Sequence, residues 1–339
     1  MQAIQISAPG QIEFTLLNST ALKHGEVRIE VALSAICGSD LKNIQNPNQI
    51  PMIPGHEFSG RIIEVAEGTN KLFKLGDRVT VFPMISCMNC EQCLAERYRD
   101  CDKKLAIGFN IPGSFASEVR VDSRFVIGLH DNISYEQGAL LEHLCCGYRL
   151  TQEIIATKKS NKSQILIIGD GPIALADLQF LKNANFTNVT VIGRRKNRLN
   201  LAVELGATHV VCSEDPDFLE GIKAFSFDIC IFAAPADDVL YKTLKYFKED
   251  VIIYPQTRIK KESILNYLSN NKISVGRAFA YFMDDFKKVM ELILIKQIKT
   301  KELISKKMSY KEYVDSFLKN NNAKERAKIL LINDSFGLE

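Results

Sequence analysis

The sequence lacks a large excess of charge of either sign, and it lacks any long apolar run. Its 43 basic and 40 acidic residues leave a formal net charge of +3 over 339 residues, too little to predict a nucleic-acid or anionic-membrane partner. No apolar stretch approaches the roughly 20 residues that span a bilayer, and the opening MQAIQISAPGQIEF has no basic segment followed by an apolar one. We therefore expect a cytoplasmic protein without a membrane partner.

Internal repeats and low-complexity segments are missing as well. With 46% apolar and 24% charged residues, the composition is that of an ordinary globular protein, which excludes disordered and fibrous classes. A chain of this length suits two domains of about 100 to 200 residues each. Clustered cysteines in a reducing compartment indicate metal binding rather than disulfides.

The two parts of the chain differ in character. Residues 1–147 read as β-rich, because EVRIEVALSAI, FSGRIIEVAEG and GDRVTVFPM alternate like strands between Pro and Gly turns. From residue 163 strands and helices alternate, which predicts a parallel, doubly wound sheet with right-handed crossovers. The last fifty or so residues read as a helix, a second helix and the closing strand KILLI. Expected elements of the second part are strands at 164–168, 188–192, 208–212, 227–233 and 250–254, a helix at 172–183, and a helix ending at 206.

Four cysteines fall within the fifteen-residue stretch CMNCEQCLAERYRDC, with the spacing C-x2-C-x2-C-x7-C. Four thiolates at one centre form the closed tetrahedral site of structural zinc. The bacterial iron–sulfur pattern places its fourth cysteine after three residues and before proline, whereas here seven residues intervene and Asp102 follows. Chance clustering is the remaining alternative. We predict a structural zinc that stabilises a lobe at about 84–104, with the ligands Cys87, Cys90, Cys93 and Cys101.

A second donor group lies upstream, in ICGSD and PGHEFSG. Cys37 would bind a metal as a thiolate and His56 as a neutral imidazole, and one carboxylate would complete a catalytic zinc site with an open position. Asp40 is placed to accept the other N–H of His56. From these residues alone, ordinary packing roles for Cys37 and His56 are equally compatible with the sequence.

The segment GDGPIA follows the apolar strand ILIIG and opens an apolar-periodic helix. A glycine turn in this position lets backbone N–H groups and the helix N-terminus meet a pyrophosphate. Asp170 is unusual here, since a carboxylate would repel a diphosphate unless its side chain points away. The predicted cofactor-binding residues of the turn are Gly169, Gly171, Pro172 and Ile173.

The end of the next strand indicates which cofactor binds. About twenty residues beyond the glycines, NAD enzymes place an acid for the ribose 2′-hydroxyl, but this sequence has Gly193 followed by Arg194 and Arg195, with Arg198 nearby. Guanidinium groups grip a 2′-phosphate in forked geometry, so NADP(H) is favoured over NAD(H). The alternative is that these arginines only form a solvated helix start.

In their order and spacing, ICGSD, PGHEFSG, GDRV, the cysteine lobe and GDGPIA resemble the zinc-containing medium-chain dehydrogenase/reductase family. Within it the chain is most similar to the polyol, sugar-alcohol and threonine dehydrogenase branch, and the resemblance covers almost the whole chain. It implies a GroES-like catalytic domain at 1–147 and 285–339, a Rossmann domain at 148–284, and a homodimer or homotetramer.

The resemblance also implies a catalytic zinc bound by Cys37, His56 and one or both of Glu57 and Glu142. Ser39 falls where the family uses a hydroxyl to relay the substrate proton. One departure is LLEHLCC, which has His143 where the family usually has proline, followed by Cys145 and Cys146. Additional ligands could alter zinc coordination, but we favour a packing role for these three residues.

The expected enzyme binds two zinc ions per chain and transfers a hydride between NADP(H) and a secondary alcohol or ketone, with a small polyol- or ketose-type substrate. Alternatives within the class are a threonine-like amino alcohol, an aminocyclitol or a sugar phosphate. A zinc-free quinone reductase is disfavoured because such enzymes lack both cysteine sets. A non-catalytic nucleotide-binding sensor or scaffold is the alternative of another class.

Overall fold

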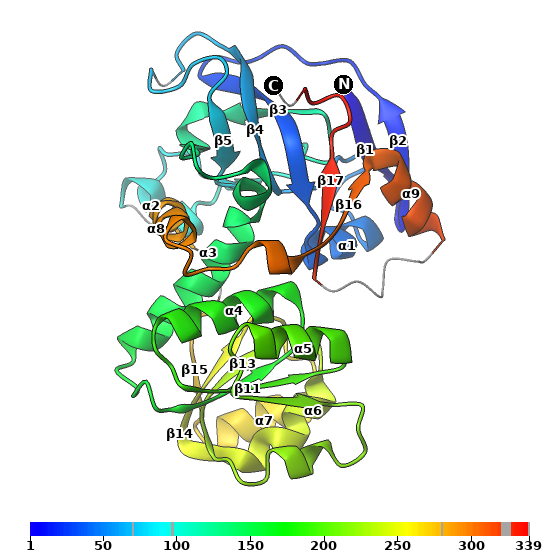
Figure 1. The fold of residues 1–339 in the computed structure, drawn as a ribbon. Helices are drawn as coiled ribbons and strands as arrows, with labels where there is room; N and C mark the ends of the chain where they lie inside the picture. Colours follow the sequence, from blue (N-terminus) through cyan, green and yellow to red (C-terminus); the bar gives the residue numbers. More distant parts are fainter. Residues whose placement is uncertain (70, 96–97, 279–280, 320–326, 338–339) are drawn as a thin grey trace. The chain divides into compact units, whose positions relative to one another are not determined.

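The computed structural model describes residues 1–69, 71–95, 98–278, 281–319 and 327–337 (Figure 1). Contacts within the chain define two compact units. Residues 96 and 97 of the expected zinc lobe, and the start of the segment ERAKILLI, lie outside the described ranges. No helix within those ranges is both long and apolar enough to cross a membrane. The first unit comprises Met1–Glu142, Phe286–Leu294 and Ile304–Glu339, and the second comprises His143–Asp285 and Ile295–Leu303.

The first unit is built on a seven-stranded sheet in the order β16-β17-β3-β4-β5-β9, with β8 also paired to β3. All pairs are antiparallel except β16 with β17. The strand predicted from EVRIEVALSAI is β3, which is buried over most of its length and lies centrally in the sheet. The strands of this sheet are β3 (Glu26–Ala35), β4 (Glu57–Val65), β5 (Arg78–Val81), β8 (Glu118–Asp122), β9 (Val126–Gly128), β16 (Ile304–Ser309) and β17 (Lys328–Ile332).

A hairpin and several helices complete this unit. The hairpin β1–β2 shares an apolar core with helix α9, to which Ile4, Ile6 and Tyr313 belong. Helix α9 begins at a capping box, in which Ser309 and Glu312 each satisfy a backbone N–H of the other residue. These elements are β1 (Gln2–Ala8), β2 (Gln11–Leu16), α1 (Gly38–Gln45), β6 (Met84–Ile85), α2 (Glu91–Leu94), β7 (Leu105–Ala106) and α9 (Tyr310–Leu318). Two helices are shared between the units: α3 (Tyr135–Ala156) begins in the first and ends in the second, and α8 (Met283–Leu294) begins in the second and ends in the first.

The second unit has a six-stranded parallel sheet in the order β12-β11-β10-β13-β14-β15. Counted from its first strand this order is 3-2-1-4-5-6, the arrangement of dinucleotide-binding folds. Helices α4 and α5 cover one face and α6 and α7 the other (Figure 1). The elements are β10 (Gln164–Ile168), α4 (Pro172–Asn183), β11 (Asn188–Gly193), α5 (Lys196–Glu204), β12 (His209–Cys212), β13 (Phe227–Phe232), α6 (Asp237–Thr243), β14 (Phe247–Pro255), α7 (Glu262–Asn270) and β15 (Ser274–Val275).

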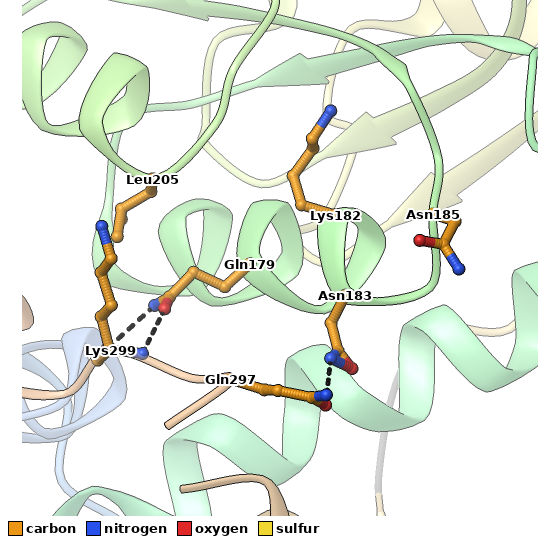
Figure 2. A pocket seen from close by; sticks show the side chains of 7 residues that line it. All are labelled: Gln179, Lys182, Asn183, Asn185, Leu205, Gln297 and Lys299. Atoms are coloured by element: carbon orange, nitrogen blue, oxygen red, sulfur yellow. Dashed lines mark hydrogen bonds between the residues drawn. The ribbon is translucent and has the colours of Figure 1, made fainter. Parts of the chain in front are cut away.

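The segment 295–303 belongs to this second unit although it follows α8 in the chain. Gln179 of α4 binds the backbone of Lys299 twice, accepting its N–H at 2.7 Å and donating to its carbonyl oxygen at 3.1 Å. Asn183 donates to the side-chain oxygen of Gln297 at 2.7 Å. Figure 2 shows how these amides form a polar surface pocket along α4. The second half of the helix that opens at the glycine turn is therefore held to this segment by hydrogen bonds.

Candidate functional site

The cysteine lobe brings its four sulfur atoms to one point in the first unit. Cys90 precedes α2 and Cys93 lies within it. All four sulfurs lie within 4.8 Å of one another, and those of Cys87 and Cys93 are 3.9 Å apart. Sulfurs about 2.3 Å from a tetrahedral zinc would be separated by about 3.8 Å, whereas a disulfide bond is about 2 Å long. The donor set therefore fits a structural zinc ion and does not fit a disulfide.

Backbone groups of the lobe favour the anionic form of one sulfur. A hydrogen bond from the backbone of Asn89 lowers the pKa of Cys87 to about 6, outweighing the opposing effect of burial. The N–H of Cys87 in turn points to the sulfur of Cys101, 3.4 Å away. Because zinc binds thiolates rather than thiols, Cys87 is prepared for the metal. Burial raises the pKa of Cys93 to about 12, so metal binding there must release a proton.

The second donor group joins the start of α1 to the start of β4. Cys37 is the N-cap of α1, and Asp40 in the first turn accepts the N–H of Cys37 at 2.8 Å. The other oxygen of Asp40 lies 3.0 Å from Nδ1 of His56. Because the buried carboxylate accepts the Nδ1–H, the other ring nitrogen of His56 is left for a metal. Phe109 packs against the imidazole, with the ring centroids 5.2 Å apart.

Electrostatics at this site favour a cation. The donor atoms of Cys37, His56 and Glu57 lie within 4.8 Å of one another. Burial would lower the pKa of His56, but the charge and hydrogen bond of Asp40, assisted by Cys37, raise it well above the ordinary value. The buried carboxylate of Asp40 thus draws a proton to the imidazole when no metal is bound. A divalent ion such as zinc would supply that positive charge and leave the imidazole neutral.

Lys328, the first residue of β17, was missed by the sequence analysis. Its ammonium group lies 2.5 Å from each carboxylate oxygen of Glu57, and its side chain is only 2% exposed. Burial would lower the pKa of Lys328, but the charges of Glu57 and Cys37 raise it, so the pair is ionic. The signal in the sequence was a single lysine opening the apolar strand KILLI. Its partner is 271 residues away in the chain, so periodicity could not identify it.

The remaining predicted residues of this site lie on α1 and α3. Ser39 is half-buried in the first turn of α1. Glu142 is buried on α3 but does not join the 4.8 Å group of Cys37, His56 and Glu57 found among the described residues. Its negative charge nevertheless contributes to raising the pKa of Lys328.

His143 makes a contact within the second unit. Its Nε2–H donates to the carbonyl oxygen of Pro172 at 3.0 Å, and the imidazole is buried. Pro172 is the first residue of α4, directly after the glycine turn. The histidine that replaces the expected proline therefore holds the start of the cofactor helix, which agrees with a packing role.

The glycine turn lies where the strand order of the second sheet reverses, at the carboxyl ends of β10 and β13. Gly169 has φ +138 and donates its N–H to the carbonyl oxygen of Ile192. A Cβ on Gly169 would come within 3.1 Å of the backbone at Ala233. Gly171 caps α4, Pro172 begins it, and nothing lies within 4 Å of a Cβ built on Gly171. The backbone at Gly171 is therefore not covered by side chains, and it lies at the N-terminus of α4 and at the topological switch point of the sheet. This arrangement fits the pyrophosphate of a dinucleotide.

The arginines follow the end of β11, and Asp170 reaches them from the glycine turn. One oxygen of Asp170 accepts the N–H groups of Arg194 at 2.9 Å and Arg195 at 2.7 Å. The other lies 3.6 Å from a guanidinium nitrogen of Arg195 and 3.8 Å from one of Arg198. Burial and the charge of Arg195 lower the pKa of Arg198, only partly opposed by Asp170. Asp170 therefore binds the turn after β11, and the arginines retain an excess of positive charge.

Comparison with known proteins identifies similar sequences over most of the chain. Residues 23–131 match the alcohol dehydrogenase GroES-like domain. The sorbitol dehydrogenase of Bacillus subtilis (strain 168) is 29% identical over 333 residues, which are 93% of this chain and 92% of that protein. The D-arabitol-phosphate dehydrogenase of Enterococcus avium is 35% identical over 231 residues, which are 66% of this chain and 64% of that protein.

A solved structure shows the same architecture. A short chain alcohol dehydrogenase from Escherichia coli CFT073, in complex with NADH, superposes with a TM-score of 0.84 at 25% identity. The match covers 98% of this chain and 99% of the other. A GroES-like domain and a parallel Rossmann-type sheet therefore coexist in this chain, as expected from its sequence.

Proposed function

We propose that this chain, whose residues 23–131 match the alcohol dehydrogenase GroES-like domain, is an oxidoreductase of the zinc-containing medium-chain dehydrogenase/reductase family. In this proposal it transfers a hydride between NADP(H) and the secondary alcohol or ketone group of a polyol-type substrate. The observation that carries the proposal is the convergence of the Cys37 and His56 donor atoms within 4.8 Å of each other, with the buried carboxylate of Glu57 beside them. A zinc ion bound there would act as a Lewis acid on the substrate oxygen, and the nicotinamide would carry the hydride.

Cys37 and His56 are the proposed protein ligands, with a carboxylate as the third. Glu57 already has both oxygens in contact with the ammonium of Lys328, which competes with metal binding. This supports Glu142 as the third ligand, with Glu57 neutralised beside the site by Lys328. Asp40 orients His56 through Nδ1, because a fixed tautomer keeps the metal-binding nitrogen deprotonated.

Ser39 is the proposed residue that moves the substrate proton. It sits two residues after Cys37 in the same helix turn, so its hydroxyl can accept the proton of a substrate alcohol and pass it onward by general acid–base relay. Ser39→Ala should lower kcat while leaving zinc content unchanged, because the serine is not a proposed ligand.

The preference for NADP(H) is proposed from the strand end at β11. Gly193 supplies no acid for the ribose 2′-hydroxyl, whereas Arg194, Arg195 and Arg198 supply guanidinium groups that suit a 2′-phosphate. The similar Escherichia coli structure contains NADH, so the two cofactors must be compared directly.

The substrate class is proposed from the relatives. Sorbitol and D-arabitol phosphate dehydrogenases favour a polyol or polyol phosphate, and the L-threonine 3-dehydrogenases at 32% identity keep an amino alcohol as the second candidate. The decisive assay is oxidation of NADPH and of NADH by the zinc-loaded protein, with parallel panels of ketoses, ketose phosphates and 2-amino-3-oxo acids.

Turnover with NADPH and a ketose or ketose phosphate would support the proposal, and turnover with the amino-keto acids alone would favour the second candidate. Cys37→Ala should reduce kcat at least 100-fold while the circular dichroism spectrum stays unchanged. Cys146→Ala is the matched control, since Cys146 is a half-buried cysteine outside both donor groups. Binding of NADPH without turnover on any panel would instead indicate a nucleotide-binding sensor.

We also propose a homodimer or homotetramer. The strand β15 lies at one edge of the second sheet, and its Val275 is 58% exposed. Light scattering on the zinc-loaded protein tests the assembly, and a mass of 38.1 kDa would exclude it.

A further inference from the structure

The sequence pattern of a glycine turn does not require an acid between its two glycines, where Asp170 lies. The structure shows which groups this carboxylate contacts. We infer that Asp170 is a specificity-determining residue, which takes the place of the acid missing from the end of β11 and limits how strongly the arginines favour NADP(H). This inference rests on the proposed function and concerns the ribose end of the same cofactor site.

The first argument is steric. A Cβ on Gly193 would lie only 2.5 Å from the Cβ of Asp170, closer than two unbonded carbon atoms can approach. Position 193, where NAD enzymes place their acid, must therefore remain glycine while Asp170 is present. The carboxylate reaches the same strand end from the other side, from the glycine turn.

The second argument is the hydrogen-bonding of the carboxylate. One oxygen accepts two consecutive backbone N–H groups, those of Arg194 and Arg195. Asp170 is only 6% exposed, so these bonds are shielded from water and fix the backbone from which both side chains project. The position of the guanidinium groups after β11 is therefore set by the residue between the two glycines.

The third argument is charge. The second oxygen lies within 4 Å of a guanidinium nitrogen of Arg195 and of Arg198. Asp170 therefore cancels one of three positive charges at the site that would receive a 2′-phosphate. The carboxylate of Asp170 would repel a 2′-phosphate but not a neutral 2′-hydroxyl. When two charged groups are neighbours in a binding site, one such charge changes the binding constant by about tenfold. The preference for NADP(H) should thus be moderate in the native protein.

The test is the dissociation constants of NADPH and NADH, measured by quenching or enhancement of nicotinamide fluorescence on the native protein and on Asp170→Asn. The amide oxygen of asparagine can still accept both backbone N–H groups, while its charge is removed. We expect the ratio Kd(NADH)/Kd(NADPH) to rise about tenfold, mainly through tighter NADPH binding. A general loss of structure would weaken both cofactors alike, so an unchanged ratio, or a shift toward NADH, overturns the inference.

Asp228→Asn is the matched control. Asp228 accepts the N–H of Gln164 at 2.7 Å and pairs with Lys248 at 2.8 Å. Like Asp170, it thus contacts backbone N–H and a cationic side chain through its two oxygens, with one partner of each kind instead of two. It lies at the amino ends of the strands, at the opposite end of the same sheet. Its substitution should leave the ratio unchanged, and an equal change in both variants would also refute a specific role for Asp170.

If Asp170→Asn does not fold, a double variant that moves the acid from position 170 to position 193 provides a second test. Asp170→Gly combined with Gly193→Asp removes the Cβ at position 170 and moves the carboxylate to the usual position at the strand end. This double variant should prefer NADH, and a retained preference for NADPH overturns the inference.

These measurements separate the inference from the proposed function. Cofactor affinities are obtained whether or not any substrate turns over, so an inactive protein that shows the predicted change in ratio would refute only the proposed reaction. If neither cofactor binds the native protein, both the inference about Asp170 and the proposed function are refuted.

Discussion

Asp177 offers a quantitative test of the structure, because it is a buried acid that forms no ion pair with any residue in the described part of the chain. It lies on α4, below the glycine turn, and is fully buried. Burial raises its pKa from the ordinary 3.8 to about 8, against the opposing effect of the hydrogen bond from Gln256. At pH 7 the folded protein therefore holds this carboxyl largely in its protonated form.

The geometry explains where the proton is held. The side-chain nitrogen of Gln256 donates to one oxygen of Asp177 at 3.1 Å. The other oxygen of Asp177 and the side-chain oxygen of Gln256 are both buried and have no hydrogen-bond partner among the described residues. Two acceptors cannot satisfy each other, but a protonated carboxyl can donate to the amide oxygen. The proton thus completes a two-bond carboxyl–amide pair.

The cost of this proton to folding follows from the two pKa values. Between pH 4 and pH 8 the unfolded chain releases the proton and the folded chain retains it, so folding stability decreases as pH rises through this window. Each pH unit contributes about 1.4 kcal/mol. At pH 7, about three units above the ordinary pKa, Asp177 lowers the free energy of unfolding by about 4 kcal/mol.

Asp177→Asn removes the titration and keeps the shape. The amide group of asparagine can make the same two hydrogen bonds with Gln256 without binding a proton. Relative to the native protein, the variant should gain about 1.4 kcal/mol per pH unit between pH 5 and pH 7, and the gain should level off near pH 8. The assay is urea unfolding followed by circular dichroism at pH 5, 6, 7 and 8.

Asp238→Asn is the control for this experiment. Asp238 is exposed on α6, and its hydrogen bond with Lys261 lowers its pKa, so it titrates below the range of the assay. Its substitution should produce a difference in stability that does not vary between pH 5 and pH 8. A difference for Asp177→Asn that is equally constant would show that Asp177 is ionised in the folded protein, and the reasoning from burial would be refuted.

Two further predictions concern the metal sites. Lys328→Met should destabilise the protein by about 3 to 5 kcal/mol in urea unfolding, because it leaves Glu57 charged and unpaired in the interior. Combining it with Glu57→Gln should recover most of that loss, and equal losses in the single and double variants would contradict the buried ion pair. Cys87→Ser should lower the zinc content by one equivalent per chain and promote unfolding, whereas Cys230→Ala, at a buried cysteine outside both donor groups, should keep the zinc content of the native protein. Zinc measured by atomic absorption decides this, and an unchanged content in Cys87→Ser would exclude zinc from the lobe.

Much of the second unit could be predicted from sequence because its signals are local. The strands β10, β11 and β13 and the helix α4 were predicted to within a residue or two at each end, since apolar strands and a glycine turn punctuate a parallel sheet clearly. The strands β15 and β16 were missed. β15 has two exposed residues, and β16 is an edge strand with two exposed lysines, so neither shows the pattern of a buried strand.

The cysteine lobe could be recognised for a similar reason. Its four ligands lie within fifteen consecutive residues, so the chain between them is too short to place the sulfurs far apart, and their spacing predicts the cluster directly. The prediction of Cys37 and His56 as a pair depended on family resemblance, because the two residues lie nineteen positions apart and each residue type alone is common in proteins.

The sequence by itself determined the alternation of strands and helices at the start of the second unit, the four-cysteine lobe and the glycine turn, because each depends on residues that are close in the chain. Only the tertiary structure decided which charges meet. Lys328 reaches Glu57 from 271 residues away, and Asp170 reaches Arg194 and Arg195 across the edge of a parallel sheet. Periodicity predicts which face of a helix or strand is buried. Which side chain it contacts there depends on strand order and packing, which bring together residues that are far apart in the sequence.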